Sequence, residues 1–324
     1  MKQILFSTVL LWALVLPLER AHAADNQGGL TLSPMFQEIS LEKNEQQKDF
    51  LVTLTNNTGS LMTLRLSLLD FGSLDESGGV AFLGATNDLE KKYALASWMR
   101  PGINTLTLAP GESQKVRVTI ENRDTLSPGG HYGALVFKVG DDTVDPNVSN
   151  EIAINQLFSV LVFVKKLGGE IYSLDLKGNE YAKSSISLPE EIETRFQNSG
   201  NVHVTPRGTV TITDPLGHVV SKGIINEESG LILPETFRTY PAHLRSLALA
   251  FIPGRYTLHI AYRYDGKDDF IVKTEQFEVF PLPAIIGVLL IGAIIVGWYV
   301  SRQRRKTGVF QASSGFDGPR PADT

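Results

Sequence analysis

Histidines and acidic residues are the side chains of this 324-residue chain that could carry acid–base or metal chemistry. The chain has no cysteine, which excludes disulfides, thiolate nucleophiles and cysteine-ligated metals. Motifs such as Gly-x-Ser-x-Gly, His-Glu-x-x-His or a glycine-rich phosphate loop are also absent. After His22, the histidines lie far apart and no two have the spacing of metal ligands; they are His131, His203, His218, His243 and His259. The sequence therefore predicts no catalytic residue, no cofactor and no metal ligand, and a protein that is not an enzyme.

Two groups of aspartates are the remaining candidates for a cation site. One group lies within residues 141–145 and the other within residues 265–269. Calcium needs about six oxygen ligands, and each group supplies three carboxylates in a turn-like stretch. We therefore interpret both as solvated loops, with calcium at residues 141–145 as the alternative. The formal net charge of −5 argues against nucleic acid as a partner.

Two aromatic residues could contact a ligand. Trp98 precedes Arg100 and Pro101, and an exposed aromatic ring beside an arginine can stack on a sugar or anchor a partner. Tyr132 follows a Pro-Gly-Gly turn at the start of an apolar stretch. Large aromatic residues in such positions mostly pack in the core, and we expect this for both.

An uncharged stretch near the C-terminus indicates where the rest of the chain lies relative to a membrane. No residue between Val279 and Ser301 is charged, and Ala284–Val300 is almost wholly apolar. About 20 such residues, rising about 1.5 Å each, span a hydrocarbon core of about 30 Å. The sequence predicts one transmembrane helix at residues 281–301. The basic residues that follow keep the tail, residues 302–324, in the cytoplasm; they are Arg302, Arg304, Arg305 and Lys306.

The N-terminus has the features of a signal peptide. A positive start at Lys2 leads into the apolar run Ile4–Leu18, and Ala21-His22-Ala23 is a small-x-small cleavage site. We expect residues 1–23 to be removed. Residues 24–283 then lie outside the cytoplasm, and the protein is a type I, single-pass protein of the cell membrane.

Between these two segments the chain alternates polar and apolar residues over short stretches separated by turn signals. Phe50–Thr55 and Leu61–Phe71 show this pattern on either side of Asn56–Gly59 and are expected to form a hairpin. Gly168-Gly169 separates two such regions. The pattern predicts an all-β protein with two immunoglobulin-like sandwiches, at residues 24–167 and 168–280. Pro281-Leu282-Pro283 is a short, stiff joint, so the second sandwich should stand close to the lipid and the first further out.

Both regions resemble the WxL-interacting surface proteins of Gram-positive bacteria. The stretches that carry the resemblance are Trp98, Leu106–Ser113 and Ser127–Ala134 in the first region, and Asn198–His203, Leu233-Pro234 and Phe251–Tyr256 in the second. The resemblance implies peptidoglycan as a ligand of the first domain and another protein as the partner of the second. It assigns no individual binding residue.

The first region is also similar to the N-terminal domain of periplasmic pilus chaperones. Phe50–Gly59 and the turn and strand from Ala109 to Val118 carry this similarity. Those chaperones hold a subunit's carboxylate with a basic residue on the first strand, whereas residues 29–42 contain no Arg or Lys. The sandwich is therefore what this similarity predicts.

Two functions follow from these features. The first is a non-catalytic tethering protein, anchored in the membrane, that contacts the cell wall, including its peptidoglycan, or another exported surface protein. The alternative is an assembly factor for exported proteins that donates a strand to an unfinished partner, with Glu151–Lys166 as the donor strand.

Overall fold

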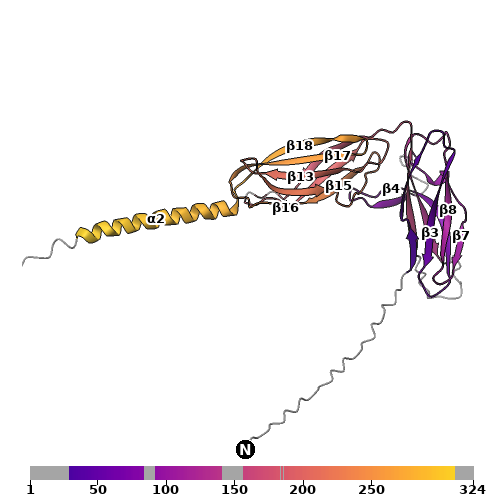
Figure 1. Ribbon diagram of the computed structural model, residues 1–324, viewed down its shortest axis with the longest axis horizontal. Coiled ribbons are helices and arrows are strands. Elements are labelled where there is room, and N and C mark those ends of the chain that lie inside the picture. The colour runs from indigo at the N-terminus through magenta and orange to yellow at the C-terminus, as the bar shows by residue number, and fades with distance from the viewer. Residues whose placement is uncertain (1–28, 84–91, 141–155, 183, 185, 311–324) are drawn as a thin grey trace, which may run out of the picture.

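The computed structural model describes residues 29–310 except 84–91, 141–155, 183 and 185, and it shows two β-sandwiches followed by one long helix (Figure 1). One end of the second sandwich meets the side of the first, and their long directions form a marked bend. The helix leaves the second sandwich at the end remote from the first. The all-β prediction with one C-terminal apolar helix is confirmed. The expected signal peptide lies outside the described residues.

The first sandwich is made of two sheets that enclose one apolar core. Its smaller sheet has the order β1-β3-β8-β6, and its larger sheet has the order β2-β10-β9-β4-β5 with β7 also paired to β4. The strands of the smaller sheet are β1 (Leu30–Ser33), β3 (Gln47–Asn56), β8 (Ser113–Glu121) and β6 (Met99–Pro101). Those of the larger sheet are β2 (Phe36–Leu41), β10 (Leu157–Lys166), β9 (Gly129–Val139), β4 (Met62–Ser73), β5 (Val80–Leu83) and β7 (Thr105–Leu108).

Alternation of apolar residues accounts for these strands, because every second side chain of a strand faces the core. In β3, for example, Phe50, Val52 and Leu54 are buried in the first core while the residues between them face outward. A 3-10 turn, η1 (Ala96–Trp98), precedes β6. The alternation of apolar and polar residues thus predicts the strands of this sandwich.

The expected hairpin between β3 and β4 is wrong. β3 pairs with β1 and β8, whereas β4 pairs with β9, β5 and β7 in the opposite sheet. The turn between them carries the chain across the sandwich, and the side chain of Asn56 is fully buried there. Its amide group donates hydrogen bonds to the carbonyl oxygens of Ser60 (2.8 Å) and Leu108 (3.1 Å). The buried amide of Asn56 therefore stabilises a turn that takes the chain from one sheet to the other, whereas a hairpin turn would have kept both strands in the same sheet.

The second sandwich has a three-stranded sheet, β11-β12-β15, and a five-stranded sheet, β16-β14-β13-β17-β18. Their bounds are β11 (Leu174–Glu180), β12 (Glu191–Asn198), β15 (Phe237–His243), β16 (Arg245–Ser246), β14 (Val219–Ile225), β13 (Arg207–Thr213), β17 (Gly254–Tyr264) and β18 (Lys267–Val279). Asn198 repeats the arrangement of Asn56: it is fully buried and donates to the carbonyl oxygens of Val202 (2.7 Å) and Ile232 (3.0 Å).

The final helix, α2 (Leu282–Phe310), is longer than predicted. Within it, Leu282–Arg304 is long and apolar enough to cross a membrane, and no other helix of the described ranges passes this test. The helix continues past the basic cluster because Arg, Gln and Lys are good helix formers. Its side chains up to Val300 are mostly exposed, as expected for a segment that faces lipid.

Candidate functional site

The histidines do not gather into one site. His218 contacts Asp214, His243 contacts Glu191, and His259 contacts Thr274, each on the surface of the second sandwich. No group of three or more His, Cys, Asp or Glu among the described residues could hold a metal ion. Among the histidines that the structure describes, only His131 and His203 are buried, and both lie where the two sandwiches meet or close to that point.

His203 connects the two sandwiches. Its imidazole Nε2 donates to the Oε1 atom of Glu38 on β2 (3.1 Å), which also accepts from Lys165 on β10 (2.8 Å). Because the carboxylate can only accept, Nε2 carries the proton, and Nδ1 accepts from the Tyr132 hydroxyl on β9 (3.2 Å). The imidazole ring also stands edge-on to the ring of Phe163. The histidine of one sandwich thus completes a chain of polar groups on the other.

Apolar packing surrounds this polar chain. Tyr132 is 1% exposed and packs in a cluster that draws residues from both sandwiches. The buried members of that cluster are Phe71, Tyr132, Ala134, Val136 and Phe163 from the first sandwich and Leu233 from the second. The expectation that Tyr132 packs in the core is correct, but the core in question is the junction between the sandwiches.

Ion pairs bound the junction. Arg195 on β12 makes two hydrogen bonds of 2.6 Å to the carboxylate of Glu76, and the Thr239 amide donates to the Glu76 carbonyl (2.8 Å). On another side, Glu235 accepts from Lys92 (2.6 Å) and from the Tyr93 hydroxyl (2.9 Å). A buried contact flanked by paired charges on two sides fixes the bend between the sandwiches.

Burial and pairing set the protonation states in the junction. The hydrogen bond from His203, aided by Lys165 and opposed by desolvation, lowers the pKa of Glu38 to about 2. Burial lowers the pKa of His203, and the hydrogen bond to Glu38 only partly offsets this effect. Burial also raises the pKa of Tyr132 well above its ordinary value. At neutral pH the three groups are therefore a carboxylate, a neutral imidazole and a neutral phenol.

The other predicted candidates have structural partners. Trp98 packs against the first core, with the Arg123 guanidinium 5.6 Å from its ring centroid. Asp265 accepts from Arg207 (2.8 Å) and from the Thr205 amide (2.8 Å), so it is a bound carboxylate rather than a solvated one. The proposed calcium alternative at residues 141–145 lies outside the described residues.

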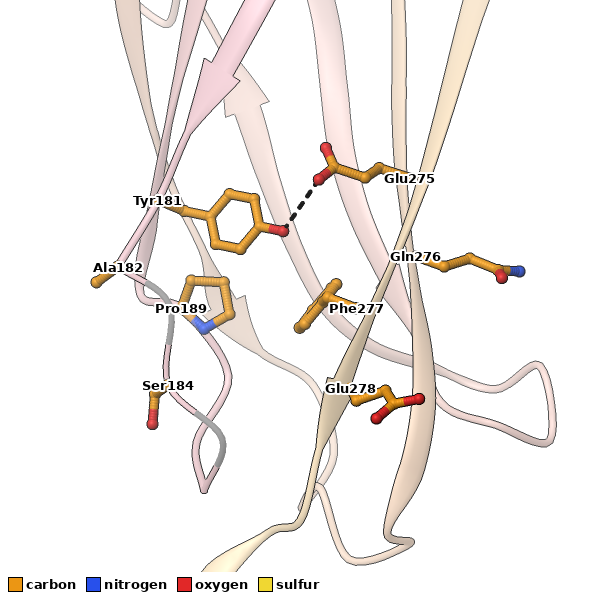
Figure 2. A pocket seen from close by; sticks show the side chains of 8 residues that line it. All are labelled: Tyr181, Ala182, Ser184, Pro189, Glu275, Gln276, Phe277 and Glu278. Carbon is orange, nitrogen blue, oxygen red and sulfur yellow. Dashed lines mark hydrogen bonds between the residues drawn. The ribbon is translucent and has the colours of Figure 1, made fainter.

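A groove of about 470 Å³ opens between the two sheets of the second sandwich. It lies between the segment after β11 and the end of β18; Figure 2 shows the Tyr181 ring across the groove from β18. The Tyr181 hydroxyl donates to Glu275 (3.3 Å), and the centroid of its ring is 5.6 Å from that of Phe277. Burial, followed by the charge of Glu275, raises the pKa of Tyr181. The groove thus combines aromatic faces with carboxylates.

Strand edges are the other surfaces on which a partner can bind. β18 has a strand partner on one side only, but charged residues occur along its whole length (KDDFIVKTEQFEV), which discourages pairing with another strand. In contrast, β10 (LFSVLVFVKK) carries charge only at its last two residues.

The first part of β10 has a free edge. β2 pairs with β10 only from Leu161 to Lys166, so no strand of the described residues covers Leu157–Val160 on that side. The amide of Val139 on β9 donates to the Gln156 carbonyl, and the amide of Leu161 donates to the Met35 carbonyl. Since backbone groups alternate between the two sides of an antiparallel strand, the N–H and C=O groups of Leu157 and Ser159 point to the free edge. Leu157 itself is 64% exposed.

The sequence contains a signal for the free edge of β10 but none for the junction between the sandwiches. Alternation and lack of charge mark β10, although the first part of the predicted donor segment, residues 151–155, lies outside the described residues. Nothing in the sequence indicates that His203, Tyr132 and Glu38 meet, because 71 residues separate the first two and 165 separate His203 from Glu38.

No protein-family model and no curated protein matches the chain. The resemblance to the WxL-interacting surface proteins therefore stays a prediction.

Solved structures of fimbrial chaperones are similar in outline. A chain from a chaperone–tip adhesin complex of CFA/I fimbriae biogenesis is 13% identical with a TM-score of 0.43, over 76% of this chain and 98% of that one. The class 5 fimbriae chaperone CfaA is 10% identical with a TM-score of 0.41, over 78% and 100%. The CsuC–CsuE chaperone-tip adhesion subunit pre-assembly complex of Acinetobacter baumannii contributes a chain that is 10% identical with a TM-score of 0.33, over 65% of this chain and 88% of that one. At this level of similarity, the binding partners of those proteins are not assigned to this chain.

Proposed function

We propose that the protein is a membrane-anchored, non-catalytic assembly factor that holds another exported protein by strand pairing along the free edge of β10. The observation that carries the proposal is the uncharged stretch Leu157–Val160, which pairs with β9 on one side and has no strand partner among the described residues on the other. An extended segment of a partner gains main-chain hydrogen bonds there, and neighbouring side chains select its sequence.

The anchor belongs to the same proposal. α2 crosses the cell membrane once, with residues 24–283 outside and the basic residues after Ser301 in the cytoplasm. A partner that has just been exported then meets both sandwiches at the membrane surface.

A substitution at Ser159 tests strand pairing. Ser159→Pro removes an outward N–H group and leaves the hydrogen bonds between β10 and β9 in place, because those come from the alternate residues. One lost hydrogen bond of about 1 kcal/mol weakens the complex by roughly fivefold. Ser159→Ala keeps the N–H group and is the matched control.

The measurement is the abundance of exported proteins in cells that lack this chain. We expect at least one of them to be degraded, and to be restored by the wild-type chain and by Ser159→Ala but poorly by Ser159→Pro. Unchanged levels of all exported proteins after deletion contradict the assembly function.

The tethering function, with the cell wall or its peptidoglycan as ligand, stays a prediction. Retention of the full-length chain on purified wall material tests it independently of Ser159, since that interaction does not involve strand pairing.

A further inference from the structure

Large apolar side chains are exposed at the end of the second sandwich from which α2 leaves. They come from four separate connections at that end: β11 to β12, β13 to β14, β16 to β17, and β18 to α2. We call these side chains the apolar rim; they are Ile186, Leu216, Leu247, Leu249, Phe251 and Phe280, between 48% and 72% exposed. Contiguous exposed apolar surface on a folded domain marks an interaction site.

Two contacts tie the rim to the helix. The amide of Leu282, the first residue of α2, donates to the carbonyl of Ile186 (3.1 Å). The Cζ atom of Phe251 lies 3.9 Å from the position that a Cβ atom would take on Gly287. The connection from β16 to β17 therefore extends alongside the second turn of α2.

The position of the lipid along α2 follows from the basic end of the helix. Arg302 follows the last uncharged residue of the span, and the hydrocarbon core takes up about 20 residues before it. This places the outer boundary of the hydrocarbon near Leu282. Gly287 is five residues further along, about 7.5 Å inside that boundary at about 1.5 Å per residue. A side chain packed beside Gly287 is then at the depth of lipid, not of water.

We infer that the apolar rim is inserted in the outer leaflet of the bilayer, so that the second sandwich is seated on the lipid and does not hang from a free joint. Leu247, Leu249 and Phe251 alternate along one connection, as in a loop that presents every second side chain to the lipid. The occupant of the rim is the acyl-chain region of the same membrane that α2 crosses, because the rim is continuous with the lipid-facing surface of the helix.

The inference rests on the proposed membrane anchor, and the absence of cysteine allows the two to be tested separately. The full-length chain with a single cysteine carries an environment-sensitive fluorophore and is reconstituted in phosphatidylcholine vesicles that contain a lipid with a nitroxide on its acyl chain. Leu249→Cys and Leu247→Cys report the rim, and Ile291→Cys reports the middle of α2. Leu61→Cys is the matched control, because Leu61 is 67% exposed but lies in the first sandwich.

We expect quenching at Leu249→Cys to be at least about half that at Ile291→Cys, since both positions are in hydrocarbon, and to be absent at Leu61→Cys. Quenching at Ile291→Cys without quenching at either rim position overturns the inference and leaves the anchor intact. This is also the result expected if the rim binds another protein instead of lipid. Absence of quenching at Ile291→Cys overturns the anchor and the inference together.

Discussion

Replacing Asn56 by alanine is expected to destabilise the first sandwich by about 3 kcal/mol, because buried backbone groups lose their partners. The Asn56 amide group donates to the carbonyl oxygens of Ser60, Leu108 and Ala109, and its Oδ1 atom accepts from the Thr58 amide (3.0 Å). An alanine removes all of these hydrogen bonds, of which the one to the Leu108 carbonyl is fully buried.

The measurement is urea unfolding of the full-length chain in detergent, followed by the change in tryptophan fluorescence that arises from Trp98, which packs against the first core, whereas Trp298 lies in α2. Asn57→Ala is the matched control, because Asn57 is exposed and its hydrogen bond to Thr31 (2.6 Å) lies at the surface. If Asn56→Ala lowers the free energy of unfolding by no more than about 1 kcal/mol, as the loss of an ordinary hydrogen bond does, the structural role of Asn56 is contradicted. Asn198→Ala should have a similar effect on the second sandwich, where the same pattern of bonds recurs.

Acidification is expected to weaken the junction between the sandwiches. His203 is neutral when buried, with a pKa lowered from 6.5 by desolvation, so the unfolded chain binds protons more readily and stability falls as the pH drops below about 6.5. Glu38 has a pKa of about 2 against 4.5 for the unfolded carboxyl. Its contribution is complete above pH 4.5 and is lost as the pH falls towards 2. Both groups therefore act in the same direction, in successive pH windows.

The readout is the midpoint of thermal unfolding, followed by the near-ultraviolet circular dichroism of the buried tyrosines. Loss of one buried hydrogen bond of about 1 kcal/mol lowers the midpoint by about 2–4 °C between pH 7.5 and pH 5.5. His203→Gln, which does not titrate, should reduce this shift, and Glu38→Gln should reduce the loss at lower pH. His218→Gln is the control, because the His218 side chain is 73% exposed. An equal shift in wild type and His203→Gln places the titrating group elsewhere.

Local patterns predict the elements of this chain but not their partners. The alternation in β3 and β4 correctly identifies two strands with one buried face each, yet it carries no information on which strand lies beside which. The hairpin was expected because the two strands are adjacent in sequence. It is wrong because Asn56 buries its amide and turns the chain into the opposite sheet.

The contacts of the junction between the sandwiches cannot be predicted from the sequence either, because they too depend on which distant segments meet. His203 and Glu38 belong to different sandwiches, and each is unremarkable in its own stretch of sequence. In contrast, α2 is predicted from composition alone, because hydrocarbon imposes a length and an absence of charge that no neighbouring element can alter. Its extension past the basic cluster is not predicted, since the hydrophobic signal ends before the helix does.

The bend between the sandwiches determines how far the first sandwich lies from the membrane. α2 continues the long direction of the second sandwich, while the first sandwich turns away from that direction (Figure 1). The thirteen residues of β18, at about 3.3 Å each, give the second sandwich a length of about 40 Å along that axis. With the rim seated on lipid and the bend held by His203, the first sandwich extends sideways over the bilayer at this distance. Under the proposed assembly function, we therefore expect partners that present an extended segment about 40 Å from the membrane surface.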